Sequence, residues 1–77
     1  MNCKYIIAFN DFKLEADSIS ALVDKVIANY KRIIGRFGML SYWNGISYEQ
    51  MKLDDIRLFR KLYTILLKKR HMENDFI

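Results

Sequence analysis

Proline is absent from this chain, glycine occurs three times, and cysteine, histidine and tryptophan occur once each. The lack of Pro-rich and Gly-rich stretches argues against a disordered linker, so the 77 residues predict one small domain. The single cysteine, Cys3, excludes an internal disulfide and favours a reducing compartment. No apolar run approaches the roughly 20 residues of a membrane-spanning helix. We therefore expect a cytoplasmic protein with no membrane partner.

Residues that carry catalytic or metal-binding chemistry are also scarce. The only histidine, His71, has no Cys or His at a ligand spacing. Asp54 and Asp55 are adjacent, and neighbours on a helix point about 100° apart, so they suit a helix N-terminus better than a paired-carboxylate site. The serines have no base nearby in the sequence. We expect a non-enzymatic protein with no catalytic residues, no metal site and no cofactor.

Apolar residues make up 52% of the chain and the net charge is +4, so a small core and an acidic partner are both compatible with the composition. The first strong pattern is a hairpin over residues 4–16, with Asn10-Asp11 as its turn. A two-residue turn places one apolar set on one face, while the opposite face is mostly polar. That set is Tyr5, Ile7, Phe9, Phe12, Leu14 and Ala16.

Residues 18–34 show the period of an amphipathic helix, capped by Asp17 or Ser18 and stopped by Gly35. A two-stranded hairpin is unstable alone in water, so this helix is its expected packing partner. The apolar residues of the helix are Ile19, Leu22, Val23, Val26, Ile27, Tyr30, Ile33 and Ile34.

Residues 36–52 allow two interpretations. In one, an aromatic loop leads into a helix that begins at Ser47, where Ser47 and Gln50 form a capping box. In the other, a second hairpin turns at Asn44-Gly45 and the last helix begins at Asp54. The second interpretation implies two ββα units, because NDFKLE at 10–15 resembles NGISYE at 44–49.

A long basic amphipathic helix is predicted over residues 53–70, followed by a loose tail at 71–77. Its apolar arc spans roughly 200°, wider than the ~100° stripe of a typical surface helix. One packed neighbour cannot cover an arc this wide. The fold class is therefore α+β, a hairpin followed by two amphipathic helices (ββαα), with ββαββα as the form that contains a second short hairpin.

Two functions are compatible with these features. The first is a small binding protein that docks on a protein partner, in the manner of the inhibitors or adaptors of host machinery encoded by phages and mobile elements. The alternative is a nucleic-acid-binding accessory protein that uses the C-terminal helix without base-specific readout. Both are compatible with a homodimer. The expected partner-binding residues are Arg57, Arg60, Lys61, Lys68, Lys69, Arg70, Tyr42 and Trp43.

Overall fold

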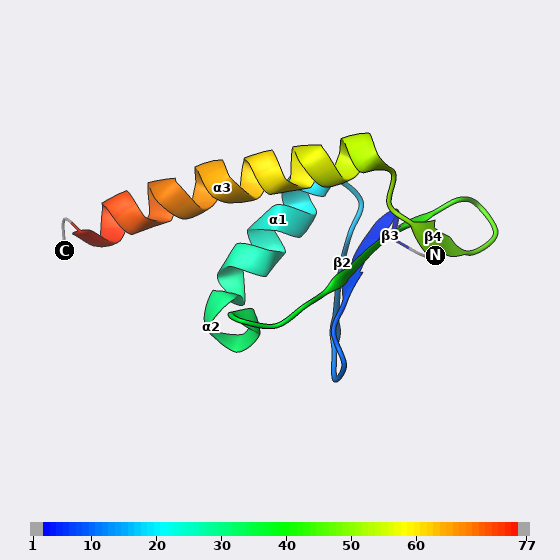
Figure 1. Cartoon of the computed structure of the whole chain (residues 1–77), viewed down its shortest axis with the longest axis horizontal. Coiled ribbons are helices and arrows are strands. Elements are labelled where there is room, and N and C mark those ends of the chain that lie inside the picture. Colours follow the sequence, from blue (N-terminus) through cyan, green and yellow to red (C-terminus); the bar gives the residue numbers. More distant parts are fainter. Residues whose placement is uncertain (1–2, 76–77) are drawn as a thin grey trace.

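The computed structural model describes residues 3–75, and the side chains of residues 3–70. It contains a four-stranded antiparallel sheet, two helical segments after the second strand, and a long C-terminal helix (Figure 1). The elements in chain order are β1 (Tyr5–Ala8), β2 (Lys13–Ala16), α1 (Ile19–Ala28), α2 (Tyr30–Ile33), β3 (Met39–Trp43), β4 (Tyr48–Gln50) and α3 (Leu53–Asp75). The α+β class is confirmed, in its ββαββα form.

The first hairpin has the predicted register, from Tyr5 opposite Ala16 to Ala8 opposite Lys13. The Phe9 N–H donates to the carbonyl oxygen of Phe12 at 2.8 Å, which closes the two-residue turn. The two phenyl rings stack with their centroids 4.9 Å apart. No residue of this turn has a positive φ, so the hairpin does not use a type I′ turn.

The second hairpin lies within residues 36–52, so the interpretation with a helix from Ser47 is wrong. Its turn is centred on Gly45, which has a φ of +102°, and on Ile46, one residue later than predicted. The Asn44 side-chain oxygen accepts hydrogen bonds from the N–H groups of Ile46 and Ser47, both at 2.8 Å. An Asn side chain bonded in this way holds a tight turn without a type I′ geometry.

The two hairpins form one sheet in the order β2-β1-β3-β4, because β1 pairs antiparallel with β3. The sequence did not predict this central pairing. The chain enters β3 through Gly38, where a Cβ would lie only 2.6 Å from the side chain of Ile7. Glycine therefore fits without displacing Ile7 where the second unit passes beside the first, and a larger residue does not.

The two hairpins are equivalent by a shift of 35 residues. This shift converts the pair Ile7–Leu14 into Tyr42–Glu49 and Ala8–Lys13 into Trp43–Tyr48. It also converts the turn bond Phe9–Phe12 into Asn44–Ser47. The predicted order of two ββα units is confirmed, but the matched motifs are 34 residues apart. A slip of one residue reverses the face of every side chain in a strand, so that motif alignment is wrong.

The predicted helix over residues 18–34 is divided at Asn29. Ser18 caps α1 by accepting a hydrogen bond from the Ala21 N–H at 3.1 Å. At the other end, the Asn29 side chain donates to the carbonyl oxygen of Lys25 at 2.8 Å, and this bond competes with continuation of the helix. The chain then makes the single turn of α2. As a result Ile33 is buried, whereas Ile34 is 60% exposed instead of facing the core.

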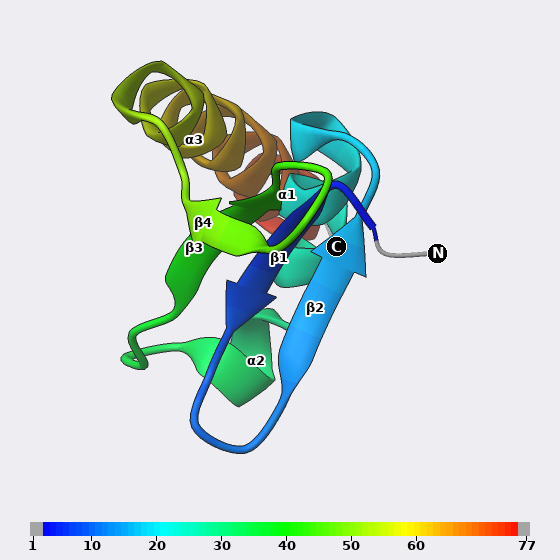
Figure 2. The ribbon, with the colours of Figure 1, turned by 90° about the vertical axis from the view of Figure 1, so that its right-hand side faces the viewer.

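The core is formed by one face of the sheet, α1, Ile33 of α2 and Phe59 of α3, and α3 packs against α1. Figure 2 shows the sheet in front of α1 with no helix on the near face, which is the outer face. Ile6 points to this outer face in the register and is nevertheless buried. The five buried residues of α1, each worth roughly 1.5–3 kcal/mol, are the largest share of the core: Ile19, Leu22, Val23, Val26 and Ile27.

The last helix begins at Leu53, close to the predicted start, and continues to Asp75. The predicted loose tail at 71–77 is wrong for residues 71–75, which are helical; residues 76 and 77 lie outside the described part of the chain. No proline or glycine interrupts the run, so the helix has no local reason to end at Arg70. Figure 1 shows α3 lying across α1 and extending beyond the rest of the molecule at its C-terminal end.

Candidate functional site

One face of α3 anchors the helix to the core. Phe59 is buried, and Leu62, Tyr63 and Leu66 are half-buried against the same core cluster. The Phe59 and Tyr63 rings stack with their centroids 6.3 Å apart, and burial raises the pKa of the Tyr63 phenol. These contacts fix the rotation of the helix, so they also decide which residues point outward.

The opposite face of α3 carries the basic stripe, which we define as Arg57, Arg60, Lys61 and Lys68. All four side chains are exposed, as the helical period predicted. The two ion pairs found among residues 3–70 are Lys13–Glu15 and Asp11–Arg36, so no carboxylate in that range neutralises the stripe. From Arg57 to Lys68 the stripe runs for about 16 Å along the helix axis.

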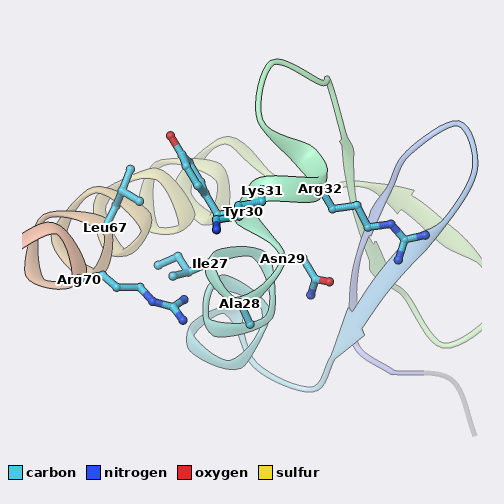
Figure 3. A pocket seen from close by; sticks show the side chains of 8 residues that line it. All are labelled: Ile27, Ala28, Asn29, Tyr30, Lys31, Arg32, Leu67 and Arg70. Atoms are coloured by element: carbon cyan, nitrogen blue, oxygen red, sulfur yellow. The ribbon is translucent and has the colours of Figure 1, made fainter. Parts of the chain in front are cut away.

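The other two predicted cations of α3, Lys69 and Arg70, do not extend the stripe in a straight line. Successive helix positions rotate by about 100°, so Arg70 falls on the side that faces α1. Arg70 helps to line a cavity of about 570 Å³ between the end of α1, α2 and α3. Figure 3 shows its guanidinium directed toward the end of α1 near Ala28.

Apolar and cationic residues both line this cavity, and none of its lining residues among 3–70 is acidic. That lining is Ile27, Ala28, Asn29, Tyr30, Lys31, Arg32, Leu67 and Arg70 (Figure 3). Sequence reasoning did not identify Lys31 or Tyr30 as site residues, because their position depends on the break at Asn29. The arrangement can accept an acidic or polar group of a partner that docks at this end of α3.

Two further cations, Arg32 and Arg36, follow α1 in the chain, and both contact the tip of the first hairpin. The Arg32 guanidinium lies over the Phe12 ring at 3.8 Å from its centroid. Arg36 forms an ion pair with Asp11 and holds the pKa of that carboxyl below its ordinary value, chiefly through the side-chain hydrogen bond. These two arginines therefore connect the link after α1 to the hairpin and do not belong to the basic stripe.

An apolar strip also remains exposed on α3, beside the basic stripe. Leu58 is 44% exposed and Ile65 is 51% exposed, while Leu62 lies half-buried between them. These three residues follow the i, i+4, i+7 spacing of a single helix face. The apolar arc is thus wider than α1 can cover, in agreement with the prediction from its width.

Tyr42 and Trp43, the two aromatic residues predicted to bind a partner, are not brought together with the basic stripe. They are successive residues of β3 and point to opposite faces of the sheet. The Tyr42 O–H donates to Glu49 at 3.0 Å, and this bond raises the pKa of the Tyr42 phenol.

Trp43 faces the outer side of the sheet and is half-buried, with the Tyr48 ring edge-on at 5.2 Å between centroids. It does not lie at a loop tip, which is formed instead by Gly45 and Ile46. The Tyr48 O–H donates to the Cys3 carbonyl oxygen at 2.7 Å, and desolvation by burial raises the pKa of Tyr48. Tyr48 was not among the predicted partner-binding residues, and pairing across the turn places it directly opposite Trp43 on the neighbouring strand.

Metal ligands and membrane spans were sought in the part of the chain that the structure describes. Among the side chains of residues 3–70, no group of three or more His, Cys, Asp and Glu could hold a metal ion. No helix in the same range is long and apolar enough to cross a bilayer. The side chain of His71 lies outside the described residues.

Comparison with known proteins gives no independent identification: the chain matches no protein-family model, no curated protein and no solved structure.

Proposed function

We propose that this chain is a non-enzymatic binding protein that docks on the acidic surface of a protein partner through the outward side of α3. The observation that carries the proposal is the basic stripe, four exposed cations on one helix face with no carboxylate to neutralise them among residues 3–70. Unpaired surface charge of one sign attracts a partner of the opposite sign and accelerates its association.

The apolar strip favours a protein partner over a phosphate backbone. Leu58 and Ile65 are exposed directly beside the cations, and protein interfaces combine an apolar centre with a charged rim. Contacts to phosphates require cations but gain little from exposed leucine and isoleucine. A protein that occupies a partner surface in this way acts as an inhibitor or adaptor, and host machinery is the target we expect for a phage-type or mobile-element-type protein.

The experiment is affinity capture with two charge-matched variants. Arg57→Glu with Lys68→Glu reverses two cations of the basic stripe, and Lys4→Glu with Lys13→Glu reverses two exposed cations outside α3. We expect the wild type and the control variant to retain a common protein partner, and the α3 variant to lose at least about tenfold in affinity for it. Equal retention by all three proteins would overturn the assignment of the site to α3.

The alternative function, nucleic-acid binding, is favoured by the same unneutralised stripe and needs a different test. Four cations along about 16 Å of helix can follow a phosphate backbone, and each contact releases counterions. This function predicts a mobility shift with mixed-sequence duplex or single strands at low salt that weakens steeply as salt rises. A lack of any shift at low salt would eliminate it, and nuclease treatment of the captured material separates the two functions.

A further inference from the structure

The apolar strip of α3 is bounded by charges of opposite sign. Asp54 precedes Leu58 by four residues, and Lys69 follows Ile65 by four residues. At about 100° per residue, these four residues and Leu62 fall within roughly 80° of arc on one side of the helix. From its N-terminal to its C-terminal end, this surface therefore carries one acidic residue, three apolar residues and one basic residue.

The charged side chains of this surface and two of its apolar side chains are exposed to solvent. Asp54 and Lys69 are exposed, and neither forms an ion pair among residues 3–70. Leu58 and Ile65 remain about half exposed after α1 has packed against the neighbouring face of α3. The acid lies near the N-terminus of α3, where a negative charge favours the helix dipole, and the base lies toward its C-terminal part.

We propose that this surface binds a second copy of the same chain, with the two α3 helices antiparallel. When a second copy of this surface runs in the opposite direction, its basic end faces the acidic end of the first copy and its apolar residues face apolar residues. In an antiparallel pair centred between Lys61 and Leu62, Asp54 of one copy lies opposite Lys69 of the other, and Leu58 lies opposite Ile65. Such a contact is isologous, because the same surface serves both copies and a two-fold axis relates them.

A parallel pair is disfavoured by the same charges. It would place Asp54 beside Asp54 and Lys69 beside Lys69, and like charges in register destabilise helix pairs. The antiparallel arrangement also opposes the two helix dipoles favourably.

The two-fold axis has a consequence for the basic stripe. Because the axis is perpendicular to both helices, Arg57, Lys61 and Lys68 of the two copies lie on the same side of the pair. Association thus doubles the cationic surface available to a partner, but it covers the apolar strip, so a partner that needs Leu58 and Ile65 competes with the second copy. The contact itself does not depend on the proposed function, because it forms from the purified chain alone.

The test uses charge exchange at the two ends of the strip. Residues 54–69 span only about 23 Å, so we expect weak association, measured by sedimentation over about 1 μM to 1 mM. The variants are Asp54→Lys, Lys69→Asp and the double exchange, with Asp24→Lys, an exposed acid on α1, as the control. Circular dichroism verifies that each variant is folded.

We expect each single exchange to weaken self-association by at least about tenfold, because it places like charges opposite one another. An equal mixture of the two single variants and the double exchange alone should both recover it, and the control should behave as wild type. The proposal is overturned if the wild type is monomeric throughout, or if the mixture associates no better than its components. Partner capture is measured separately, so failure here leaves the proposed function to its own test.

Discussion

The two ββα units of this molecule use the same local plan for different ends. In the first unit, α1 places five aliphatic side chains in the core between the sheet and α3. In the second unit, Phe59 is the only buried side chain among residues 53–70 of α3. The first helix, α1, is covered by the sheet on one side and by α3 on another. The second helix, α3, is covered mainly by α1, and it exposes both the basic stripe and the apolar strip.

This difference shows that position in the layers, more than local sequence pattern, decides what an amphipathic helix contributes. The apolar residues of α1 stabilise the fold because the sheet and α3 together remove them from water. The comparable residues of α3 stay partly in water, so they contribute little to folding. Their exposed apolar surface remains available for binding.

The largest expected effect is on the free energy of unfolding, and it distinguishes a leucine of α1 from a leucine of α3. Leu22 on α1 is fully buried, and Leu22→Ala should lower the free energy of unfolding by about 3–5 kcal/mol, because it removes contacts and leaves a cavity. Leu58→Ala on α3 should cost less than about 1 kcal/mol, since Leu58 is already half in water. Urea unfolding at low protein concentration, followed by circular dichroism, measures both. Equal losses would contradict the division between the units.

A smaller effect is expected where the two units pass each other. Gly38→Ala places a methyl group against Ile7 and should lower the free energy of unfolding by about 1–3 kcal/mol through overpacking. The same change in an Ile7→Ala background should cost less, because alanine lacks both the Cγ1 and the Cδ1 atoms, which lie 2.6 and 2.7 Å from the new methyl group. A double-mutant cycle gives the coupling, and strict additivity would show that the two residues do not interact.

The smallest effect concerns the hairpin tips, which the two units hold differently. The second tip is held internally by Asn44, whereas the first depends on the Asp11–Arg36 ion pair. The pKa of Asp11 is lowered on folding, so its stabilisation is full above the unfolded pKa of about 3.9 and is lost as pH falls through the folded pKa.

Asp11→Asn should therefore lower the melting temperature slightly near pH 7, and its difference from wild type should shrink below about pH 4. Asp24→Asn, which removes an exposed acid that forms no ion pair among residues 3–70, serves as the control. A difference for Asp11→Asn that stays constant down to the folded pKa and below would show that the ion pair does not stabilise the tip.

Features that depend on neighbouring residues in the chain were predicted well from the sequence. The register of the first hairpin follows from strand alternation, the cap at Ser18 from its hydroxyl, and the basic stripe from helical period. The pairing of β1 with β3 joins segments more than thirty residues apart, and no local pattern encodes it. The break at Asn29 was missed because the helical pattern continues across it.

The candidate site shows the same limit. Tyr42 and Trp43 were both predicted to bind a partner, but a strand sends adjacent residues to opposite faces. The contacts of Arg32 and Arg36 with Phe12 and Asp11 join the chain after α1 to a distant hairpin, and no local pattern in the sequence indicates them. Charge on a helix face can be read from the sequence, whereas the neutralisation of that charge by other elements requires the structure.

The placement of Trp43 gives the chain an intrinsic optical probe. It is the only tryptophan, and its indole lies half-buried against Tyr48 on the outer face of the sheet. Its emission therefore follows the integrity of β3 and β4 without an added dye. Because the indole lies on the sheet and not on α3, its emission reports loss of the sheet separately from occupation of the helix.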